Sequence, residues 1–385
     1  MISRSFKRKF IFLFCLISAS NCSSEEEVPS ELYGLPFIKV YVEAKDWQKM
    51  FDNIDEKLKV PAQIYINGQN QAGMINPAGA SSLTLYKKNF QITLQEDIDG
   101  FGNEFRLAAQ TVDASGIHSL FGYKAFAAAG ISVPLNKAVV AQIGDGHPSL
   151  YLMIENVEQG FFDRRNQSLH SIYKARNNKG NLFPNSLNYL NDGFKRKEGP
   201  EGNWDLKNLI LTLELKNQEP DRANILPLVQ EDQMLKYLAV HFLIGHVDGT
   251  INNYILANLY STSSGTALSL PEFQLIPWDL DRLFDYPGIT GFNSNSLMLF
   301  LTSSETTCSQ WLAALSTLIN STFQLNEATK ILDDTASSIS TIFPIDPHYQ
   351  HQAPLEEQLK IMKEKLTNQY QASLELIAST TCQAQ

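Results

Sequence analysis

The stretch that decides the fold is residues 244–284, which contain Gly-His-Val-Asp-Gly at 245–249, Asn-Asn-Tyr at 252–254 and Ile-Pro-Trp-Asp-Leu-Asp at 276–281. Asp248 is followed five residues later by Asn253. The apolar run at 273–277 predicts a strand that delivers Asp279 and Asp281. On extended backbone these two side chains face one side, where they can share a divalent cation. The stretch therefore predicts a site built from carboxylate and amide oxygens.

The same order of residues resembles the catalytic centre of protein kinases. There an Asp accepts the proton of the attacking hydroxyl, an Asn five residues later holds magnesium, and another Asp beyond the next strand holds the metal from the other side. The resemblance makes Asp248 the catalytic residue and Asn253 and Asp279 the metal ligands, with Asp281 adding to the metal shell. Structural roles are the alternatives. Asp248 followed by Gly249 is a common turn sequence, and Asp281 can form an ion pair with Arg282.

Further motifs extend the resemblance to one family, the CotH kinases, atypical protein kinases first associated with the bacterial spore coat. The matching strands and early helix lie at 35–40, 87–92, 113–130, 150–155 and 172–174. Judged by motif order, the match covers roughly residues 35 to 380. It implies an α+β, two-lobed protein-kinase-like fold. The β-rich N-terminal lobe would occupy 35–148 and the mainly helical C-terminal lobe 149–382.

Hydrophobic periodicity predicts the same succession of elements. It indicates strands at 37–43, 62–66, 71–75, 86–94, 137–143, 149–156, 254–260 and 272–276, and helices at 45–58, 114–129, 206–215, 234–243, 311–323 and 355–377. Asn67-Gly68 between two strands is a strong hairpin signal. A strand-rich first part thus precedes a mainly helical second part.

Two adjacent lysines at the head of a strand, Lys87 and Lys88, are candidates for binding nucleotide phosphates, as the strand lysine of a kinase does. Lys88 shares its strand face with Phe90 and Ile92, which is unusual for a surface lysine and favours it over Lys87. The alternative is that both lysines protect an edge strand from pairing with other chains. The resemblance implies ATP with Mg²⁺ or Mn²⁺ as the cofactors.

The remaining nucleotide contacts follow from the resemblance. Gly79 and Ser81 belong to the turn that would cover the phosphates through backbone N–H groups. Lys174 would approach the phosphates from the second lobe. Glu155 either lies beside the adenine or is an ordinary carboxylate at a strand end. In this turn the sequence departs from the family, which has Arg and Asn where this chain has Ala78 and Ala80, so a catalytically weak or inactive member is an alternative.

The first residues predict export. A positive segment containing Arg4 and Lys7–Lys9 precedes the apolar run Phe10–Ile17, as in a secretory signal peptide. Cys22 follows small and polar residues, which predicts a lipoprotein with lipid on Cys22; the alternative is an ordinary signal peptide. Residues 1–22 would form the signal segment and residues 23–34 an acidic, flexible tether to the membrane.

Composition sets further limits. The chain of 385 residues is 43% hydrophobic, enough for the core of two lobes. Loss of residues 1–21 removes four positive and no negative charges, so the net charge changes from −10 to −14. Such a chain would repel nucleic acid and attract a basic protein substrate. Export would permit a disulfide between Cys308 and Cys382, although two separate thiols are the alternative.

Together these features predict an exported kinase that transfers the γ-phosphoryl group of ATP to Ser or Thr of a protein. One rival is a catalytically weak or dead surface lipoprotein of the same fold that acts in binding or adhesion. Another is a nucleotidyl or glycosyl transferase, because Asp-x-Asp motifs also occur in glycosyltransferases that use nucleotide sugars.

Overall fold

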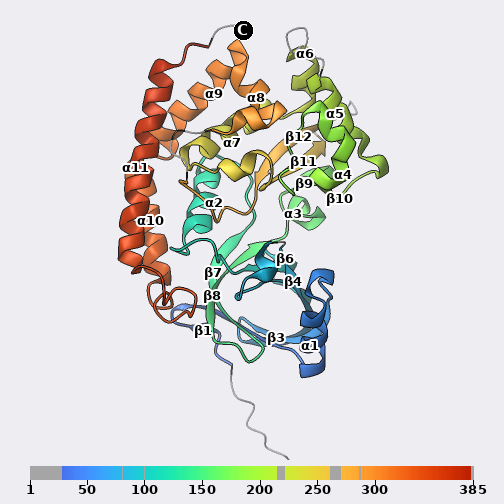
Figure 1. The fold of residues 1–385 in the computed structure, drawn as a ribbon, viewed down its shortest axis with the longest axis vertical. Coiled ribbons are helices and arrows are strands. Elements are labelled where there is room, and N and C mark those ends of the chain that lie inside the picture. Colours follow the sequence, from blue (N-terminus) through green and yellow to red (C-terminus); the bar gives the residue numbers. More distant parts are fainter. Residues whose placement is uncertain are drawn as a thin grey trace, which may run out of the picture.

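Strands dominate the first part of the chain and helices the second (Figure 1). The computed structural model describes residues 28–79, 81–98, 100–214, 222–260, 270–285, 288 and 290–382. These residues form a mixed α/β fold with two separate β-sheets. Cys22 and the signal segment at 1–22 lie outside the described residues, as do Ala80 and residues 23–27 of the expected tether.

The first sheet has eight strands in the order β1-β2-β3-β4-β5-β6-β8-β7. A parallel pairing between β2 and β7 joins the two sides of this order, so the sheet closes on itself. The strands are β1 (Glu31–Leu32), β2 (Leu35–Tyr41), β3 (Val60–Ile66), β4 (Gln69–Ala78), β5 (Asn89–Ile98), β6 (Gly102–Ala108), β7 (Asn136–Ile143) and β8 (Ser149–Glu155).

Alternation along these strands sends every second side chain into a common apolar interior. Ile64, Ile75, Ile92, Phe105 and Val139 belong to this core and are fully buried. The β3–β4 turn contains the expected Asn67-Gly68 pair, with φ values of 52° and 74°. Positive φ at both positions is what a two-residue hairpin turn requires, which confirms the hairpin prediction.

The second sheet is antiparallel, with four strands in the order β10-β9-β11-β12. They are β9 (Ser168–Ala175), β10 (Phe194–Glu198), β11 (Tyr254–Tyr260) and β12 (Pro271–Pro277). From Tyr254 to Leu259 every residue of β11 is buried, which means that both faces of this central strand are covered. β12 ends immediately before Trp278 and Asp279 and so positions the main sequence motif.

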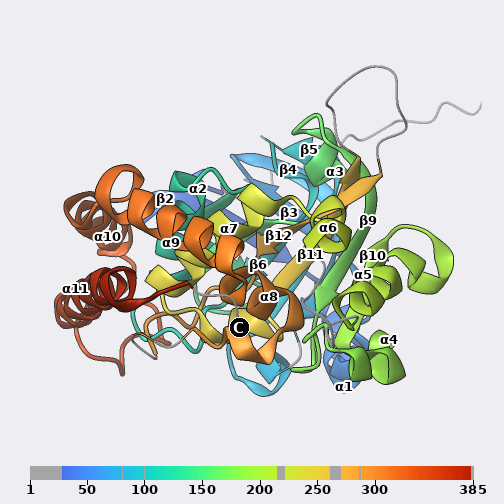
Figure 2. The same cartoon turned by 90° about the horizontal axis from the view of Figure 1, so that it is seen from above.

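Helices cover the second sheet and flank the molecule. They are α1 (Ala44–Asp52), α2 (His118–Ala128), α3 (Gln159–Asp163), α4 (Leu190–Gly193), α5 (Trp204–Glu214), α6 (Arg222–Ile225), α7 (Glu231–Leu243), α8 (Ser296–Ser303), α9 (Glu305–Thr317), α10 (Leu325–Ile339) and α11 (Leu355–Ser379). α10 and α11 lie on the flank opposite α4, α5 and β10 (Figures 1 and 2).

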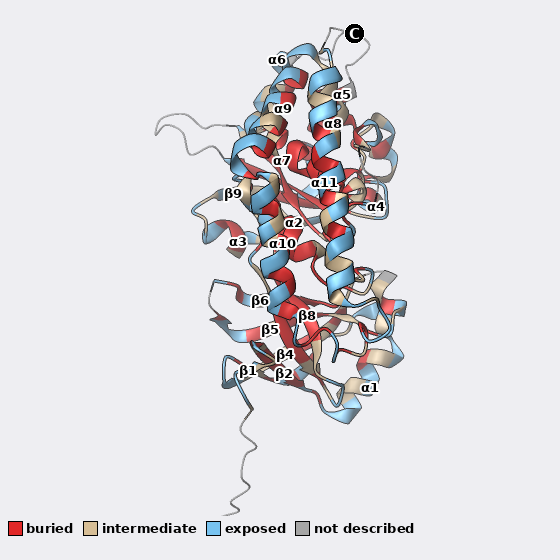
Figure 3. Ribbon diagram, turned by 90° about the vertical axis from the view of Figure 1, so that its left-hand side faces the viewer, coloured by how far each residue is buried: buried red, intermediate tan, exposed pale blue. Residues whose placement is uncertain are grey.

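One large core unites the second sheet with most helices, including α2. The outer faces of α10 and α11 are exposed while their inner faces are buried (Figure 3). A disulfide joins Cys308 of α9 to Cys382, with 5.8 Å between the Cα atoms, and so fixes the chain beyond α11 to the helical body. Among the described residues, no helix combines the length and apolar character that crossing a membrane requires.

Several elements differ from the sequence prediction, among them the helix expected at 311–323, which runs from Glu305 to Thr317, and α10, which was not expected. The division at residue 148 separates β7 from β8, although the two strands form one hairpin of the first sheet. The strand expected at 86–94 begins only at Asn89. β6 was not predicted, because Glu104 and Arg106 on its outer face interrupt the apolar pattern that Phe105 and Leu107 carry on the inner face.

Candidate active site

A cleft of about 780 Å³ lies between the two sheets. Five residues predicted from the sequence line it, and they lie on strands of both sheets or in the segments next to those strands: Gly79, Lys174, Asn253, Asp279 and Asp281. The cleft therefore brings together predicted positions that are about 200 residues apart in the chain.

Asp279 reaches the cleft by an unusual backbone turn. The chain leaves β12 at Pro277, and Asp279 has a φ of 59°, in the left-handed region. The expectation of extended backbone is therefore wrong here. Asp279 and Asp281 nevertheless line the same cleft, because Leu280 between them is fully buried against α2. A Cβ on Gly122 of α2 would lie 2.9 Å from Leu280 Cδ1, so the close approach depends on that glycine.

The carboxylate of Asp281 lies in surroundings that disfavour its charged form. Burial raises the pKa of Asp281 well above its ordinary value, and the neighbouring charges of Asp279 and Asp113 raise it further, against the opposing effect of Arg106. Two carboxylates crowded in this way favour a bound cation or proton. Behind them, His118 Nδ1 lies 3.1 Å from the carbonyl oxygen of Asp281 and fixes the loop against α2.

The donor set fits a magnesium–nucleotide complex better than a metal held by protein alone. In the described part of the chain, no group of three or more His, Cys, Asp and Glu residues is arranged to hold a metal. Mg²⁺ commonly binds one or two carboxylates and completes its shell with substrate phosphates and water. Asp279 and Asp281, with the amide oxygen of Asn253, are such a set.

Asn253 is oriented by its neighbours. The Asn252 side chain donates a hydrogen bond of 3.0 Å to Asn253 Oδ1. The backbone N–H groups of both residues donate to the Asp248 carbonyl oxygen, each over 3.2 Å. Asn252 thus supports the position of Asn253, and the turn links both to Asp248.

Asp248 itself is at the edge of this arrangement. It lies in the 3₁₀ turn Val247–Thr250, and its side chain is 42% exposed. Its carboxylate accepts a hydrogen bond of 3.2 Å from Arg282, which also pairs with Asp285 over 3.0 Å. Asp248 is not among the residues that line the cleft.

His246 connects the two motifs. It is fully buried, 5.5 Å from the ring of His241. Burial lowers its pKa to about 4, although the nearby carboxylate and backbone of Asp279 act to raise it. The ring is therefore neutral at physiological pH and lies between the Asp248 turn and the Asp279 loop, which agrees with a role in orienting them.

The double lysine is not part of the cleft. The Lys87 ammonium is buried and forms an ion pair of 2.9 Å with Asp346, between the rings of Tyr151 and Tyr349. Lys88 donates to the carbonyl oxygen of Leu85. Because β5 starts after both lysines, at Asn89, strand parity does not decide where they point.

Arg106 on β6 is the cation that sequence reasoning missed. Its neighbours Phe105 and Leu107 face the interior of the first sheet, so Arg106 points outward into the cleft. It is only 7% exposed, and its Nε is buried with no hydrogen-bond partner. The alternation of apolar and polar residues along 102–108 was the signal available.

Arg106 and Lys174 approach the ring of Trp278, at 5.9 and 4.6 Å from its centroid. Burial, together with the positive charge of Arg106, lowers the pKa of Lys174 to about 7, whereas Asp279 acts to raise it. Trp278 is buried and also lines the cleft. Two basic side chains thus stand beside the two carboxylates.

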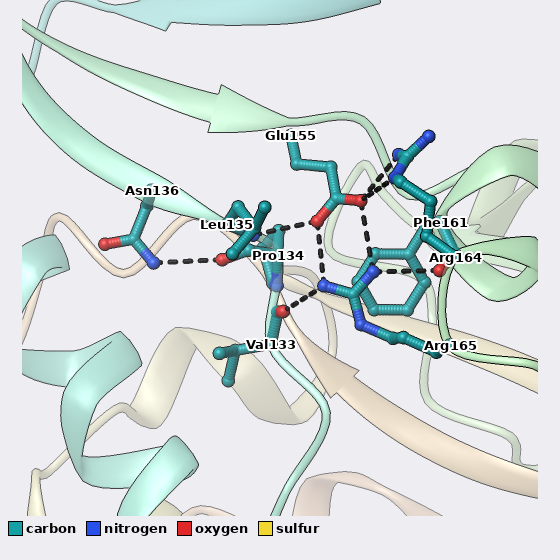
Figure 4. A network of polar contacts seen from close by, with 8 residues as sticks. All are labelled: Val133, Pro134, Leu135, Asn136, Glu155, Phe161, Arg164 and Arg165. Carbon is teal, nitrogen blue, oxygen red and sulfur yellow. Dashed lines mark hydrogen bonds and ion pairs between the residues drawn. The ribbon is translucent and has the colours of Figure 1, made fainter. Parts of the chain in front are cut away.

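Glu155 belongs to a buried network of polar contacts outside the cleft (Figure 4). It ends β8, is fully buried and does not line the cleft. Its carboxylate accepts hydrogen bonds from Arg164 at 2.6 Å, from Arg165 at 2.9 Å and from the backbone of Leu135 at 2.9 Å. It therefore ties β8 to α3 and to the segment before β7.

The predicted phosphate turn lies at the cleft. Gly79 has a φ of 96°, and a Cβ there would collide with Ser82 and lie 3.4 Å from Arg106 Nη2, so glycine is required. Ala78 and Ser82 line the cleft beside it. Ser81 begins a 3₁₀ turn, and the position of its side chain is outside what the structure describes.

The chain is similar to known proteins of one family. A family model described as CotH kinase protein matches residues 75–377. The inner spore coat protein H of Bacillus subtilis strain 168 is 23% identical over 280 residues, which cover 68% of this chain and 75% of that protein.

Two solved structures are similar at low TM-score and 12% identity. The Helicobacter pylori proinflammatory kinase CtkA covers 74% of this chain and 94% of its own, with a TM-score of 0.32. The HipA–HipB toxin–antitoxin complex of Shewanella oneidensis MR-1 covers 89% and 73%, with a TM-score of 0.35. Scores this low carry no argument about the site. The family model, by contrast, spans most of the sequence, and the chain belongs to the CotH kinase family.

Proposed function

We propose that this protein is a protein kinase that transfers the γ-phosphoryl group of ATP to Ser or Thr hydroxyls of a protein, with the two sheets serving as the two lobes. The observation that carries the proposal is the cleft. It is lined by the carboxylates of Asp279 and Asp281, by the amide of Asn253, and by Arg106 and Lys174. Oxygen ligands for a metal and basic groups for phosphate, gathered in one cleft, are what a metal-bound triphosphate requires.

Each residue then has a defined task. Asp279 and Asn253 would hold Mg²⁺ or Mn²⁺, with Asp281 beside them, and the bound metal would neutralise charge on the transferred group. Arg106 and Lys174 would bind phosphate oxygens. The acceptor hydroxyl attacks the γ-phosphorus, the bond to ADP breaks, and Asp248 takes the hydroxyl proton. Asp248 is half-exposed, so a protein substrate arriving from solution can reach it.

The first test is calorimetric titration of the purified protein with ATP, in the presence and absence of Mg²⁺ or Mn²⁺. The second is an assay for transfer of labelled γ-phosphate to a general protein substrate. Asp279→Ala should abolish metal-dependent binding and transfer together. The matched control is Asp145→Ala, which removes an exposed carboxylate from the β7–β8 loop. If the wild type binds no nucleotide with either metal, the kinase proposal fails.

The rival reading as an inactive surface protein is favoured by Ala78, which lines the cleft without the charge that the family's usual Arg supplies. It predicts a folded protein with neither ATP binding nor transfer. The transferase reading predicts binding of a nucleotide sugar in place of ATP, and the same titration with UDP-glucose would detect it.

We also propose that the protein is exported and lipid-anchored through Cys22. The charged and apolar segments before Cys22 support this, and the Cys308–Cys382 disulfide suits an oxidising compartment. Cys22→Ser should move the protein from the membrane to the soluble fraction and prevent labelling by a fatty-acid probe. Unchanged labelling would contradict the proposal.

A further inference from the structure

The cleft is positively charged although the chain as a whole is acidic, with a net charge of −10. Charged side chains of both signs line it, but cations outnumber acids. The cations are Lys57, Lys59, Arg106, Lys174, Arg176, Lys195 and Lys197, and the acids are Glu104, Glu158, Asp279 and Asp281. The local charge, rather than the net charge, decides which ligand the cleft attracts.

Part of this charge is already compensated. Lys59 pairs with Glu104 over 3.1 Å, and Lys197 pairs with Glu158 over 2.7 Å. Arg106 and Lys174 stand beside the candidate metal ligands and are assigned to the nucleotide. Three cations remain, which we call the outer basic cluster: Lys57, Arg176 and Lys195. None of the three forms an ion pair with any residue that the structure describes.

The cluster is assembled from both sheets. Lys57 follows a 3₁₀ turn just before β3 of the first sheet, with a φ of 52°. Arg176 follows β9, and Lys195 lies on β10 of the second sheet. Lys57 and Lys195 are exposed, so they are at the mouth of the cleft rather than on its floor. A ligand that touches all three must enter between the sheets.

The second sheet places like charges together. Lys195 is the direct cross-strand partner of Lys174, and directly opposed side chains share one face of a sheet. Like charges in this arrangement destabilise the pairing. The crowding by Lys197, Arg176 and Lys57 also lowers the pKa of Lys195. An anion bound across the mouth would relieve this repulsion.

Arg176 adds a directional donor. Its Nη2 donates to the carbonyl oxygen of Asn191, while its Nε is buried with no hydrogen-bond partner. A guanidinium held in this way presents planar N–H groups that match a carboxylate or phosphate. Because Nε is buried, the terminal amino groups of Arg176 are the ones that could bind an anion entering the cleft.

We propose that the outer basic cluster binds an acidic segment of the protein acceptor, so that the kinase phosphorylates Ser or Thr flanked by Asp or Glu. This inference rests on the proposed function and adds the class of substrate to it. The carboxylates of the segment would face Lys57, Lys195 and Arg176 while the hydroxyl points toward Asp248. The charge of the cleft thus favours an acidic substrate, whereas the net charge of the chain predicts a basic one.

The experiment uses two labelled peptides that differ only in the residues around one Ser, acidic in one and basic in the other. Fluorescence anisotropy should show that the acidic peptide binds at least about tenfold more tightly at low salt, as expected for charge-assisted contacts. This preference should fall as salt shortens the range of electrostatic attraction. Lys195→Glu and, from the other sheet, Lys57→Glu should each abolish most of the preference.

The matched control is Lys330→Glu, which reverses an exposed charge on α10, on the opposite flank of the molecule. It should bind the acidic peptide as the wild type does. Equal binding of both peptides, or an equal effect of all three variants, would overturn the inference.

ATP titration of the same variants separates the two proposals. If Lys195→Glu weakens ATP binding but not peptide preference, the cluster belongs to the nucleotide site and the inference falls while the kinase proposal stands. If the wild type prefers the acidic peptide but binds no ATP, the kinase proposal fails and the acidic-ligand surface remains.

Discussion

The guanidinium of Arg282 donates a hydrogen bond of 3.2 Å to the carboxylate of Asp248 and so joins the two halves of the decisive motif. The backbone supports the same connection, because Phe284 N–H donates to the Ile244 carbonyl oxygen over 3.0 Å. The candidate general base is therefore attached to the loop that carries the candidate metal ligands, although it does not itself line the cleft.

Asp248→Asn should retain ATP affinity and lose phosphotransfer by about 10²–10⁴-fold, because an amide cannot accept the proton. Arg282→Ala should change the free energy of unfolding by no more than about 1 kcal/mol, since the pair is half-exposed. Titration with ATP, a transfer assay and urea unfolding of both variants check this. Loss of ATP affinity in Asp248→Asn would place Asp248 in the nucleotide site instead.

Arg106→Ala should weaken ATP binding by roughly 10- to 100-fold, because a buried charged hydrogen-bond donor contributes about 1.5–3 kcal/mol. Lys88→Ala should leave ATP binding unchanged, since Lys88 does not line the cleft and its ammonium is held by the Leu85 carbonyl oxygen. Calorimetry on the two variants compares the cation found in the structure with the cation expected from sequence. The reverse ranking would restore Lys88 to the nucleotide site.

Lys87→Met should lower the free energy of unfolding by about 3–5 kcal/mol, because it leaves the buried carboxylate of Asp346 without its cation. Asp346 would retain only its backbone donors, the N–H groups of Leu150 and His348. The double variant Lys87→Met/Asp346→Leu should lose less than the two single variants added together. Urea unfolding measures this coupling, and simple additivity would show that the pair does not interact.

Acid should destabilise the protein through His241. Burial and the neighbouring His246 lower the pKa of His241 well below 6.5, so the folded state excludes a proton that the unfolded state binds. Stability is then complete above pH 6.5 and falls with a slope of about 1.4 kcal/mol per pH unit for this histidine as the pH decreases.

His241→Phe, which keeps an aromatic ring beside Phe292, should reduce that slope, whereas His147→Phe in the exposed β7–β8 loop should not. Urea unfolding between pH 7.5 and 5 provides the measurement. An unchanged slope in His241→Phe would show that other groups control the acid sensitivity.

The disulfide closes a loop of 74 residues between Cys308 and Cys382. A crosslink over this separation commonly stabilises a fold by about 2–4 kcal/mol, chiefly by restricting the unfolded chain. Cys382→Ser should lower the free energy of unfolding by this amount, and reductant should do the same to the wild type only. Peptide mass spectrometry without reduction would refute the crosslink if it found two free thiols.

Local motifs in the sequence specify the positions of two residues of the cleft. Asn253 and Asp279 lie next to strands whose apolar runs are unambiguous, and both line the cleft. Local motifs do not specify where the lysines before β5 lie. Lys87 carries a strong strand-like context, yet its partner Asp346 is 259 residues away, and no local pattern reveals such a pair.

Arg106 shows the complementary failure. The periodicity of 102–108 is short and interrupted by charge, and the closing of the sheet through the β2–β7 pairing is a long-range event. Glu155 was equally ambiguous, because a carboxylate at a strand end has the same sequence appearance whether it meets a ligand or two arginines. These outcomes depend on tertiary contacts rather than on propensity.

The left-handed backbone of Asp279 means that natural selection and selection for stability alone would favour different residues there. An L-residue with a positive φ costs roughly 1 kcal/mol or more, and glycine removes that cost. In a library randomised at position 279 and screened only by heat resistance, glycine should be enriched and the carboxylate lost. A screen for phosphotransfer should retain Asp. Enrichment of Gly in one screen and of Asp in the other would show that function, rather than folding, determines the residue at this position.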